Sequence, residues 1–179
     1  MPPGIEVISP SKGDPILAAA ALKVARTSLS KRARFPADKR FEQAFSILRH
    51  DAVWIAVEGE VVRGVLVLRK HGRNPFVLNH AKQIYGRFRV LRHLLIDSIS
   101  SGRSVHVASF WTAPELRGQG LGAAMLKAAL PQDAKVTLHA RPGREAFYRR
   151  HGFRDGGSWR MRLIGRIAGM SPMHRPRGG

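Results

Sequence analysis

The stretch from Val107 to Leu126 restricts the possible folds more than any other part of the chain. Its sequence is VASFWTAPELRGQGLGAAML, in which an apolar run ends at a proline, glycines occupy positions 118, 120 and 122, and alanines follow. Glycine adopts backbone conformations that other residues avoid, and it leaves neighbouring amides open to a ligand. The stretch therefore predicts a strand, a tight turn and a helix that begins inside the turn.

The start of this predicted helix has the chemistry of an anion site. The first N–H groups of a helix lack intrahelical partners, and the positive end of the helix dipole lies at the same point. Phosphate groups bind at such ends, and Arg117 can add a positive charge. A nucleoside-triphosphate loop would require Lys and then Ser or Thr after Gly122, but two alanines follow it. A dinucleotide fold would require an acidic residue where His139 stands. The pattern thus predicts a pyrophosphate site of neither class.

The remaining periodicity predicts a mixed α/β fold. Strands are expected at residues 5–8, 53–57, 61–68, 104–111, 135–139 and 158–164, and helices at 15–28, 36–49, 77–99, 117–130 and 144–151. Asp14 is the expected N-cap of the first helix, with Pro15 at its first position. Because strands and helices alternate in the middle of the chain, at least those strands should be parallel, in a sheet of about six or seven strands.

A single domain is expected. The length of 179 residues suits one domain, and 44% hydrophobic residues suffice for a core. We expect that domain at residues 1–164, with a helical insertion at about 75–100. The Gly-, Pro- and Arg-rich residues 165–179 are expected to form a basic tail without regular structure. The apolar stripe of the insertion is either ordinary core or the face of a homodimer.

Some classes of site are excluded or not expected. The chain contains no cysteine, which excludes disulfides, thiolate metal sites and a cysteine nucleophile. No metal site is expected. Residues 1–9 lack the basic start and apolar core of a secretory leader, and no transmembrane span is expected, so a cytoplasmic location is the default expectation.

The charge of the chain is strongly positive and unevenly spread. Lys and Arg number 31 against 12 Asp and Glu, a formal net charge of +19. Such a charge favours association with a polyanion, for example nucleic acid, a ribosome or other nucleoprotein, or acidic protein. Residues 104–140 carry three basic and two acidic side chains, whereas residues 141–179 carry ten and two. The excess positive charge therefore indicates the binding of a partner or an acceptor more than it indicates the predicted pyrophosphate site.

Two motifs, in the expected order, resemble the GCN5-related N-acetyltransferase (GNAT) superfamily. Arg117-x-x-Gly120-x-Gly122, after a strand and the turn Ala-Pro-Glu-Leu, resembles the acetyl-coenzyme A (acetyl-CoA) signature of that family. Residues 145–153, EAFYRRHGF, resemble the short helix that ends in Gly-Phe. Gly64 stands where the family often has a glycine in its third strand. The motifs that resemble the family lie within residues 104–153, and the expected order of strands and helices resembles that of the family over about residues 5–164.

The resemblance implies a fold and a cofactor. The fourth and fifth strands would splay apart in a V, and an acetyl group would pass from acetyl-CoA to a primary amine. The acyl-pantetheine arm would bind the backbone of Phe110, Trp111 and Thr112. The pyrophosphate would lie on the amides of Arg117, Gly118, Gln119, Gly120, Leu121 and Gly122.

The resemblance also implies catalytic residues. Tyr148 falls where many members place the general acid that protonates the departing thiolate, a role that suits a phenol with a pKa of about 10. His106 lies eleven residues before Arg117, where the protein-acetylating members have a glutamate that acts as the general base. Histidine titrates near neutral pH and could accept the proton of an amine. His139 on the neighbouring strand is a second candidate for the base.

The chain departs from the family at two positions. Many members have an asparagine seven residues before the tyrosine, where this chain has Arg141, and a small residue three positions further on, where it has Arg144. These arginines could instead bind the 3′-phosphate of coenzyme A.

The acceptor is the least determined part of the prediction. In the family, the turn between the first two helices flanks the acceptor site, which implies that Lys31, Arg32 and Arg34 bind the acceptor. That acceptor would be an acidic macromolecule, either a protein or an aminoacyl-tRNA. The alternative is a basic nucleic-acid-, ribosome- or assembly-associated protein that uses the fold for docking with little catalysis.

Overall fold

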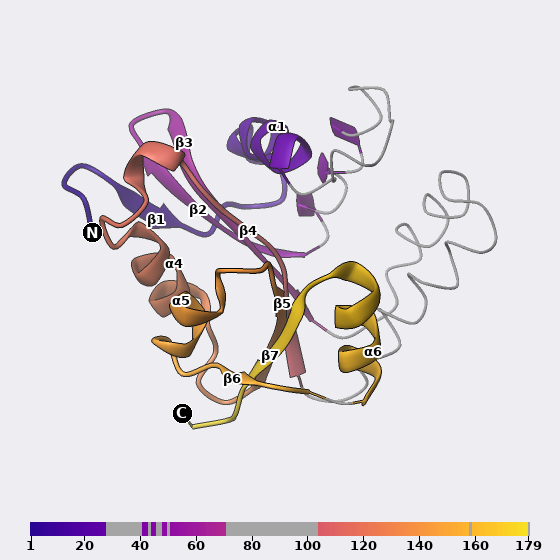
Figure 1. Ribbon diagram of the computed structural model, residues 1–179. Coiled ribbons are helices and arrows are strands. Elements are labelled where there is room, and N and C mark those ends of the chain that lie inside the picture. The colour runs from indigo at the N-terminus through magenta and orange to yellow at the C-terminus, as the bar shows by residue number, and fades with distance from the viewer. Residues whose placement is uncertain are drawn as a thin grey trace. The chain divides into compact units, whose positions relative to one another are not determined.

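The computed structural model describes residues 1–27, 41–42, 44–45, 48–49, 51–70, 104–157 and 159–178. The strands are β1 (Glu6–Ile8), β2 (Ala52–Glu58), β3 (Val61–Lys70), β4 (Ser104–Thr112), β5 (Lys135–Ala140), β6 (Arg154–Asp155) and β7 (Ser171–Arg175) (Figure 1). The helices are α1 (Ile16–Thr27), the 3-10 turn η1 (Pro114–Leu116), α4 (Leu121–Ala129), α5 (Glu145–Arg149) and α6 (Trp159–Ala168). The described residues between 41 and 49 are helical too. The expected insertion at 75–100 lies outside the described residues.

The seven strands form one mixed sheet in the order β1-β2-β3-β4-β5-β7-β6. The pairs β1–β2, β2–β3, β5–β7 and β6–β7 are antiparallel, and β4 and β5 are parallel. This arrangement confirms the predicted mixed α/β fold and the parallel pair at its centre. None of the described helices is long and apolar enough to cross a membrane.

The strands β4 and β5 part soon after they meet. Their paired residues run from Ser104 with Lys135 to His106 with Thr137. Both strands continue beyond that point, β4 to Thr112 and β5 to Ala140. Over its remaining length β5 pairs with β7 on its other side. The expected V-shaped splay is therefore present in the pairing of the strands.

The described residues belong to two compact units. The first takes in Met1–Leu68 and Ala108–Leu130, and the second takes in Arg69–Val107 and Pro131–Gly179. The glycine-rich turn lies in the first unit, and the predicted catalytic residues His106 and Tyr148 lie in the second.

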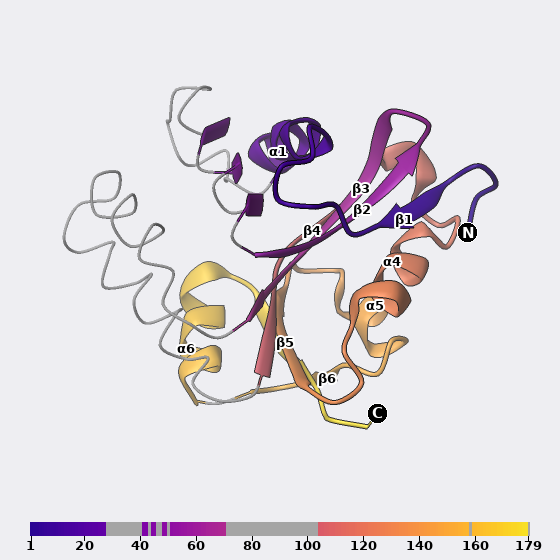
Figure 2. The same cartoon turned by 180° about the vertical axis from the view of Figure 1, so that it is seen from behind.

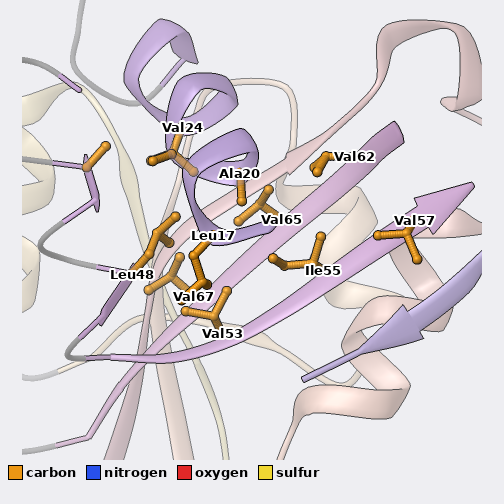
Figure 3. Close-up of a cluster of buried hydrophobic side chains, with 12 residues drawn as sticks. Leu17, Ala20, Val24, Leu48, Val53, Ile55, Val57, Val62, Val65 and Val67 are labelled. Carbon is orange, nitrogen blue, oxygen red and sulfur yellow. The ribbon is translucent and has the colours of Figure 1, made fainter. Parts of the chain in front are cut away.

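In the first unit, α1 packs on the β2–β3 hairpin (Figure 3). The N–H group of Ile16 donates to Asp14 Oδ1 at 2.9 Å, so Asp14 caps α1 as predicted. The apolar side chains of the helix meet those of one hairpin face, and the labelled members of this cluster are Leu17, Ala20, Val24, Leu48, Val53, Ile55, Val57, Val62, Val65 and Val67. Their burial holds the hairpin and the helix together.

A glycine in β3 lets α4 approach the hairpin closely. A Cβ atom on Gly64 would lie 2.5 Å from Met125 Sδ and 3.3 Å from the Cβ atom of Ala56. Met125, on α4, is fully buried, so it has little room to move. The family-like glycine of the third strand is therefore explained by packing.

We expect Gly64→Ala to lower the free energy of unfolding by about 1–3 kcal/mol, because the added methyl group overpacks the contact with Met125. Denaturant unfolding measures this change. Gly13→Ala is the matched control, since a Cβ atom there meets nothing within 4 Å. Equal stability of the two variants would contradict the packing explanation.

In the second unit, α5 and α6 lie on opposite sides of β5 and β7 (Figures 1 and 2). The buried residues of β5 on the α5 side include Val136 and Leu138, and β7 adds Met173. On the α6 side, His139 contacts the main chain of the helix through Met161. The β5–β7 pair is thus covered on both faces.

The predicted strand at residues 158–164 is wrong, because residues 159–164 lie in α6. Apolar Trp159 and Met161 alternate with arginines, which resembles the period of a strand. The helical period prevails, since Met161 and Gly165, one turn apart, are buried, while Arg162 and Arg166 are exposed. Tertiary packing decides here over the local pattern.

The predicted unstructured tail at residues 165–179 is also wrong. Gly169 has a φ angle of 63° and ends α6, with the N–H group of Met170 donating to the carbonyl of Gly165 at 2.8 Å. The chain then forms β7, in which Met173 is fully buried. Arg175 donates to Gln132 Oε1 at 3.0 Å, so the last basic residue of β7 is tied to the second unit. Strand pairing, rather than strand propensity, organises this segment.

Candidate functional site

The glycine-rich turn presents the amino end of α4 without a side-chain cap. Gly118 and Gly120 have φ angles of 82° and 83°, in the region where glycine is favoured. Gly120 is the N-cap of α4, and no side chain caps the helix there. The N–H group of Ala124 donates to the carbonyl of Gly120 at 3.0 Å. The amides of residues 121–123 therefore precede the first hydrogen bond of the helix.

The same turn is open to a ligand. Residues 117–120 are exposed, and a Cβ atom on Gly118 would meet nothing within 4 Å. The helix dipole adds a partial positive charge at this end, and the guanidinium of Arg117 adds a full one. The turn thus fits a pyrophosphate, as the sequence predicts.

Arg63 fixes the segment that leads into the turn. Its guanidinium lies 2.9 Å from Glu115 Oε1 through Nη1 and 2.7 Å from Glu58 Oε2 through Nη2. Its carbonyl accepts the N–H group of Ala113 at 2.8 Å, and Gln119 Nε2 donates to the carbonyl of Glu115 at 2.9 Å. The sequence gives no signal for this role, since Arg63 and Glu115 are 52 positions apart.

The end of β4, where the pantetheine arm is expected, is half-buried at Phe110, Trp111 and Thr112. Trp111 packs against the α1 cluster, and Lys23 Nζ lies 5.8 Å from the centre of its ring. Ala108 packs against the same cluster, although strict alternation would place it and Trp111 on opposite faces. Simple alternation of faces therefore does not describe the end of this strand.

Tyr148 is held by the way α5 ends. Gly152 has a φ angle of 81°, its N–H group donates to the carbonyl of Arg149 at 3.1 Å, and that of Phe153 donates to the carbonyl of Tyr148 at 3.1 Å. This is a Schellman ending, in which the residue after the glycine packs back on the helix. The ring centres of Phe153 and Phe147 lie 5.7 Å and 5.1 Å from that of Tyr148. The Gly-Phe motif thus orients the Tyr148 ring.

The phenol of Tyr148 keeps its proton at neutral pH. Burial raises its pKa to about 12, although the charges of Arg144 and Arg141 oppose this shift. Such a group can donate a proton to a leaving thiolate, but it cannot serve as the base. Its surroundings suit the predicted general-acid role, which stays a prediction. The two arginines are exposed, at the start of the turn into α5.

The two candidate bases lie close together beside Thr137. The ring centres of His106 and His139 are 5.6 Å apart. Nδ1 of His106 is 3.0 Å from the hydroxyl of Thr137, which donates to the carbonyl of Val105 at 3.4 Å. Thr137 thus holds the ring of His106 through Nδ1. Sequence reasoning missed this role of Thr137.

His139 is less suited to proton transfer than His106. Its Nε2 atom lies 3.2 Å from the carbonyl of Met161 on α6, to which it donates. Burial lowers the pKa of His139, and the hydrogen bond to Met161 only partly opposes that shift. The ring thus joins β5 to α6 as a neutral donor, which is a structural role.

The predicted site residues are distributed over both units. His106 is half-buried on the α6 side of the second unit, and Tyr148 belongs to α5 on the other side of β5. The residues of the glycine-rich turn belong to the first unit. Lys31, Arg32 and Arg34, the predicted acceptor-binding residues, lie outside the described residues.

The comparisons with known proteins agree with this fold. The family described as "Acetyltransferase (GNAT) domain" matches residues 49–155. An acyl-CoA N-acyltransferase from Pseudomonas aeruginosa superposes with a TM-score of 0.59 at 16% identity, over 96% of this chain and 99% of that one. An N-acetyltransferase from Staphylococcus aureus Mu50 gives 0.59 at 12% identity, over 94% and 98%.

A third structure, titled histone acetyltransferase HPA2 and related acetyltransferase, from Corynebacterium glutamicum, gives a TM-score of 0.58 at 17% identity, over 97% of both chains. No curated protein sequence matches this chain. The family match spans more than half of the chain, so the protein belongs to the GNAT acetyltransferase family. That family uses acetyl-CoA as its co-substrate.

The buried state of His139 predicts a pH effect on stability. In the unfolded chain its pKa returns to the ordinary 6.5, so the unfolded state binds more protons below that pH. We expect the melting temperature to fall as the pH is lowered from 7 to 5. In His139→Gln, which keeps a donor for the Met161 carbonyl but does not titrate, this fall should be smaller.

Melting curves between pH 5 and pH 7 measure the effect. His151→Gln is the comparison, because burial lowers the pKa of His151 as well and its titration acts in the same direction. An identical pH dependence in the wild type and in His139→Gln would refute the role given to His139.

Proposed function

We propose that this protein transfers an acetyl group from acetyl-CoA to a primary amine. The observation that carries the proposal is the uncapped and exposed amino end of α4 behind Gly118 and Gly120, in a member of the GNAT family. The amides of residues 121–123 and the side chain of Arg117 would hold the pyrophosphate. Exposed Arg141 and Arg144 would meet the 3′-phosphate, and the end of β4 would bind the pantetheine arm.

The chemistry requires two proton transfers. The amine nitrogen attacks the thioester carbonyl carbon and loses a proton, the carbon–sulfur bond breaks, and the sulfur takes up a proton. His106, whose ring is held beside Thr137, would accept the first proton directly or through water, because histidine titrates near neutral pH. Tyr148 would donate the second, because burial keeps its phenol protonated.

The acceptor that we propose is an amine on an acidic macromolecule in the cytoplasm, either a protein or an aminoacyl-tRNA. The net charge of +19 supports an acidic partner. Lys31, Arg32 and Arg34 would contribute to its binding. A small polycation is disfavoured, since such a substrate needs carboxylates and the chain has only 12 Asp and Glu.

Binding of acetyl-CoA is the first test. A concentration of about 100 times the dissociation constant adds about 2.7 kcal/mol to the stability, which corresponds to a rise of about 5–10 °C in melting temperature for a chain of this size. Thermal unfolding with and without acetyl-CoA measures it. An unchanged melting temperature at saturating acetyl-CoA would leave only the alternative, a basic docking protein with a GNAT fold.

Two glycine variants locate that binding. Gly120→Ala puts a side chain on the N-cap residue of α4 at a φ angle of 83°, so we expect it to lose stability and the acetyl-CoA response. Gly59→Ala is the matched control, because it has a φ angle of 57° and nothing within 4 Å of its Cβ position. It should lose stability but keep the response.

A Tyr148→Phe variant tests the general acid. The ring still packs on Phe147 and Phe153, so stability and the acetyl-CoA response should hold. Loss of the proton donor should lower kcat about 10²- to 10⁴-fold. Turnover with an accepted amine, compared with the melting-temperature shift in acetyl-CoA, separates the two effects. Wild-type turnover in this variant would remove Tyr148 from the mechanism.

A further inference from the structure

An irregularity in the β2–β3 hairpin leaves Arg63 without a partner strand residue. Ala56 of β2 lies opposite Gly64 of β3. The next residue of β2, Val57, lies opposite Val62, so Arg63 is an extra residue in β3. This is a β-bulge, which bends a strand and redirects a side chain, and bulges are over-represented next to active sites. The bulge thus indicates a role for Arg63 outside the hairpin.

The bulge also decides which side chains of β3 face α1. Val65 and Val67 belong to the buried cluster that α1 covers, and strict alternation along β3 would place Arg63 on the same face. The bulge brings Val62 to that face instead (Figure 3). A guanidinium buried there without a partner would be costly. The bulge therefore completes the apolar face and keeps Arg63 out of it.

Arg63 joins the hairpin to the segment before the glycine-rich turn. Its guanidinium donates to Glu58 Oε2 through Nε at 2.8 Å and to Glu115 Oε1 through Nη1 at 2.9 Å. Its carbonyl accepts the N–H group of Ala113 at 2.8 Å. All of these residues belong to the first unit. One residue thus binds the segment through both its side chain and its main chain.

Glu115 connects Arg63 with the turn itself. The carboxylate of Glu115 accepts from Arg63, and its carbonyl accepts from Gln119 Nε2 at 2.9 Å. Gln119 lies between Gly118 and Gly120, both of which have positive φ angles. Glycine loses more conformational freedom than other residues when it is ordered, so a turn that is held in advance binds a ligand at a smaller entropic cost. We call Arg63, Glu115 and Gln119 the Arg63 network.

We propose that the Arg63 network holds the glycine-rich turn in the conformation that binds the pyrophosphate of acetyl-CoA, with Arg63 and Glu115 as positioning residues. This inference rests on the proposed function, because acetyl-CoA has to bind at the turn. A carboxylate near an anion site repels the ligand, so removal of Glu115 would strengthen binding if charge alone acted. A positioning role has the opposite sign, since removal of Glu115 then weakens binding.

Calorimetric titration of the full chain with acetyl-CoA and with dephospho-coenzyme A tests the proposal. Glu115→Ala should weaken the binding of both ligands about 3- to 10-fold, because both carry the pyrophosphate. Glu115→Gln removes the same charge but keeps an oxygen that can accept from Arg63 Nη1, so it should restore most of the affinity. Equal affinities in these two variants would contradict the positioning role.

Glu60→Ala is the matched control for the loss of a carboxylate. Glu60 is exposed on the same hairpin as Arg63, and it forms no ion pair within the part of the chain that the structure describes. Its removal should leave the affinity for acetyl-CoA unchanged or slightly higher. All variants should keep nearly the wild-type melting temperature without ligand, because exposed ion pairs contribute little stability.

A double variant separates position from charge. Arg63→Ala should weaken binding, and the addition of Glu115→Ala should not restore it, because both side chains act through one contact. Restored binding in the double variant, or binding in Glu115→Ala as tight as in the wild type, would overturn the proposal and assign the effect to charge. Absence of acetyl-CoA binding in the wild type would instead overturn the proposed function, and this inference with it.

Discussion

The short parallel contact between β4 and β5 is the constraint on which the rest of the structure depends. The strands pair only as far as His106 and Thr137. Beyond that point each must satisfy its backbone groups elsewhere, since an unpaired buried amide or carbonyl is costly. β5 forms its further hydrogen bonds with β7, and the chain after β4 donates to the carbonyl of Arg63. The glycine-rich turn comes shortly after this bond to Arg63.

Glycines set the backbone geometry of both family motifs and of β3, for different reasons. Gly118 and Gly120 permit the left-handed turn that frees the amides of α4, and Gly152 permits the ending of α5 that orients Tyr148. Gly64, by contrast, has an ordinary φ angle and is required because Met125 approaches it. The glycines of the two family motifs are thus required by the local backbone conformation, whereas the glycine of β3 is required by packing.

The sequence predicts those features whose cause is local. The tight turn at Gly118 and Gly120, the cap at Asp14 and the strands β2 and β3 follow from neighbouring residues, and the structure confirms them. The contacts of Arg63 with Glu115 and of Thr137 with His106 join positions that are far apart in the sequence, so no local sequence pattern predicts them. The segments α6 and β7 were predicted wrongly for a related reason, because the burial of Met161 and the pairing of β7 with β5 depend on distant parts of the chain. The catalytic and acceptor roles remain predictions.

The order of β5, β7 and β6 in the sheet has a consequence for how the chain is made. β7 follows β6 in sequence but lies between β5 and β6. While the chain emerges from the ribosome, β5 and β6 therefore cannot join one sheet until residue 175 has been released. Until then β5 exposes the edge that β7 later covers, including the main chain of Leu138 and Ala140. The second unit should accordingly be the late-folding and more aggregation-sensitive part of this protein during synthesis.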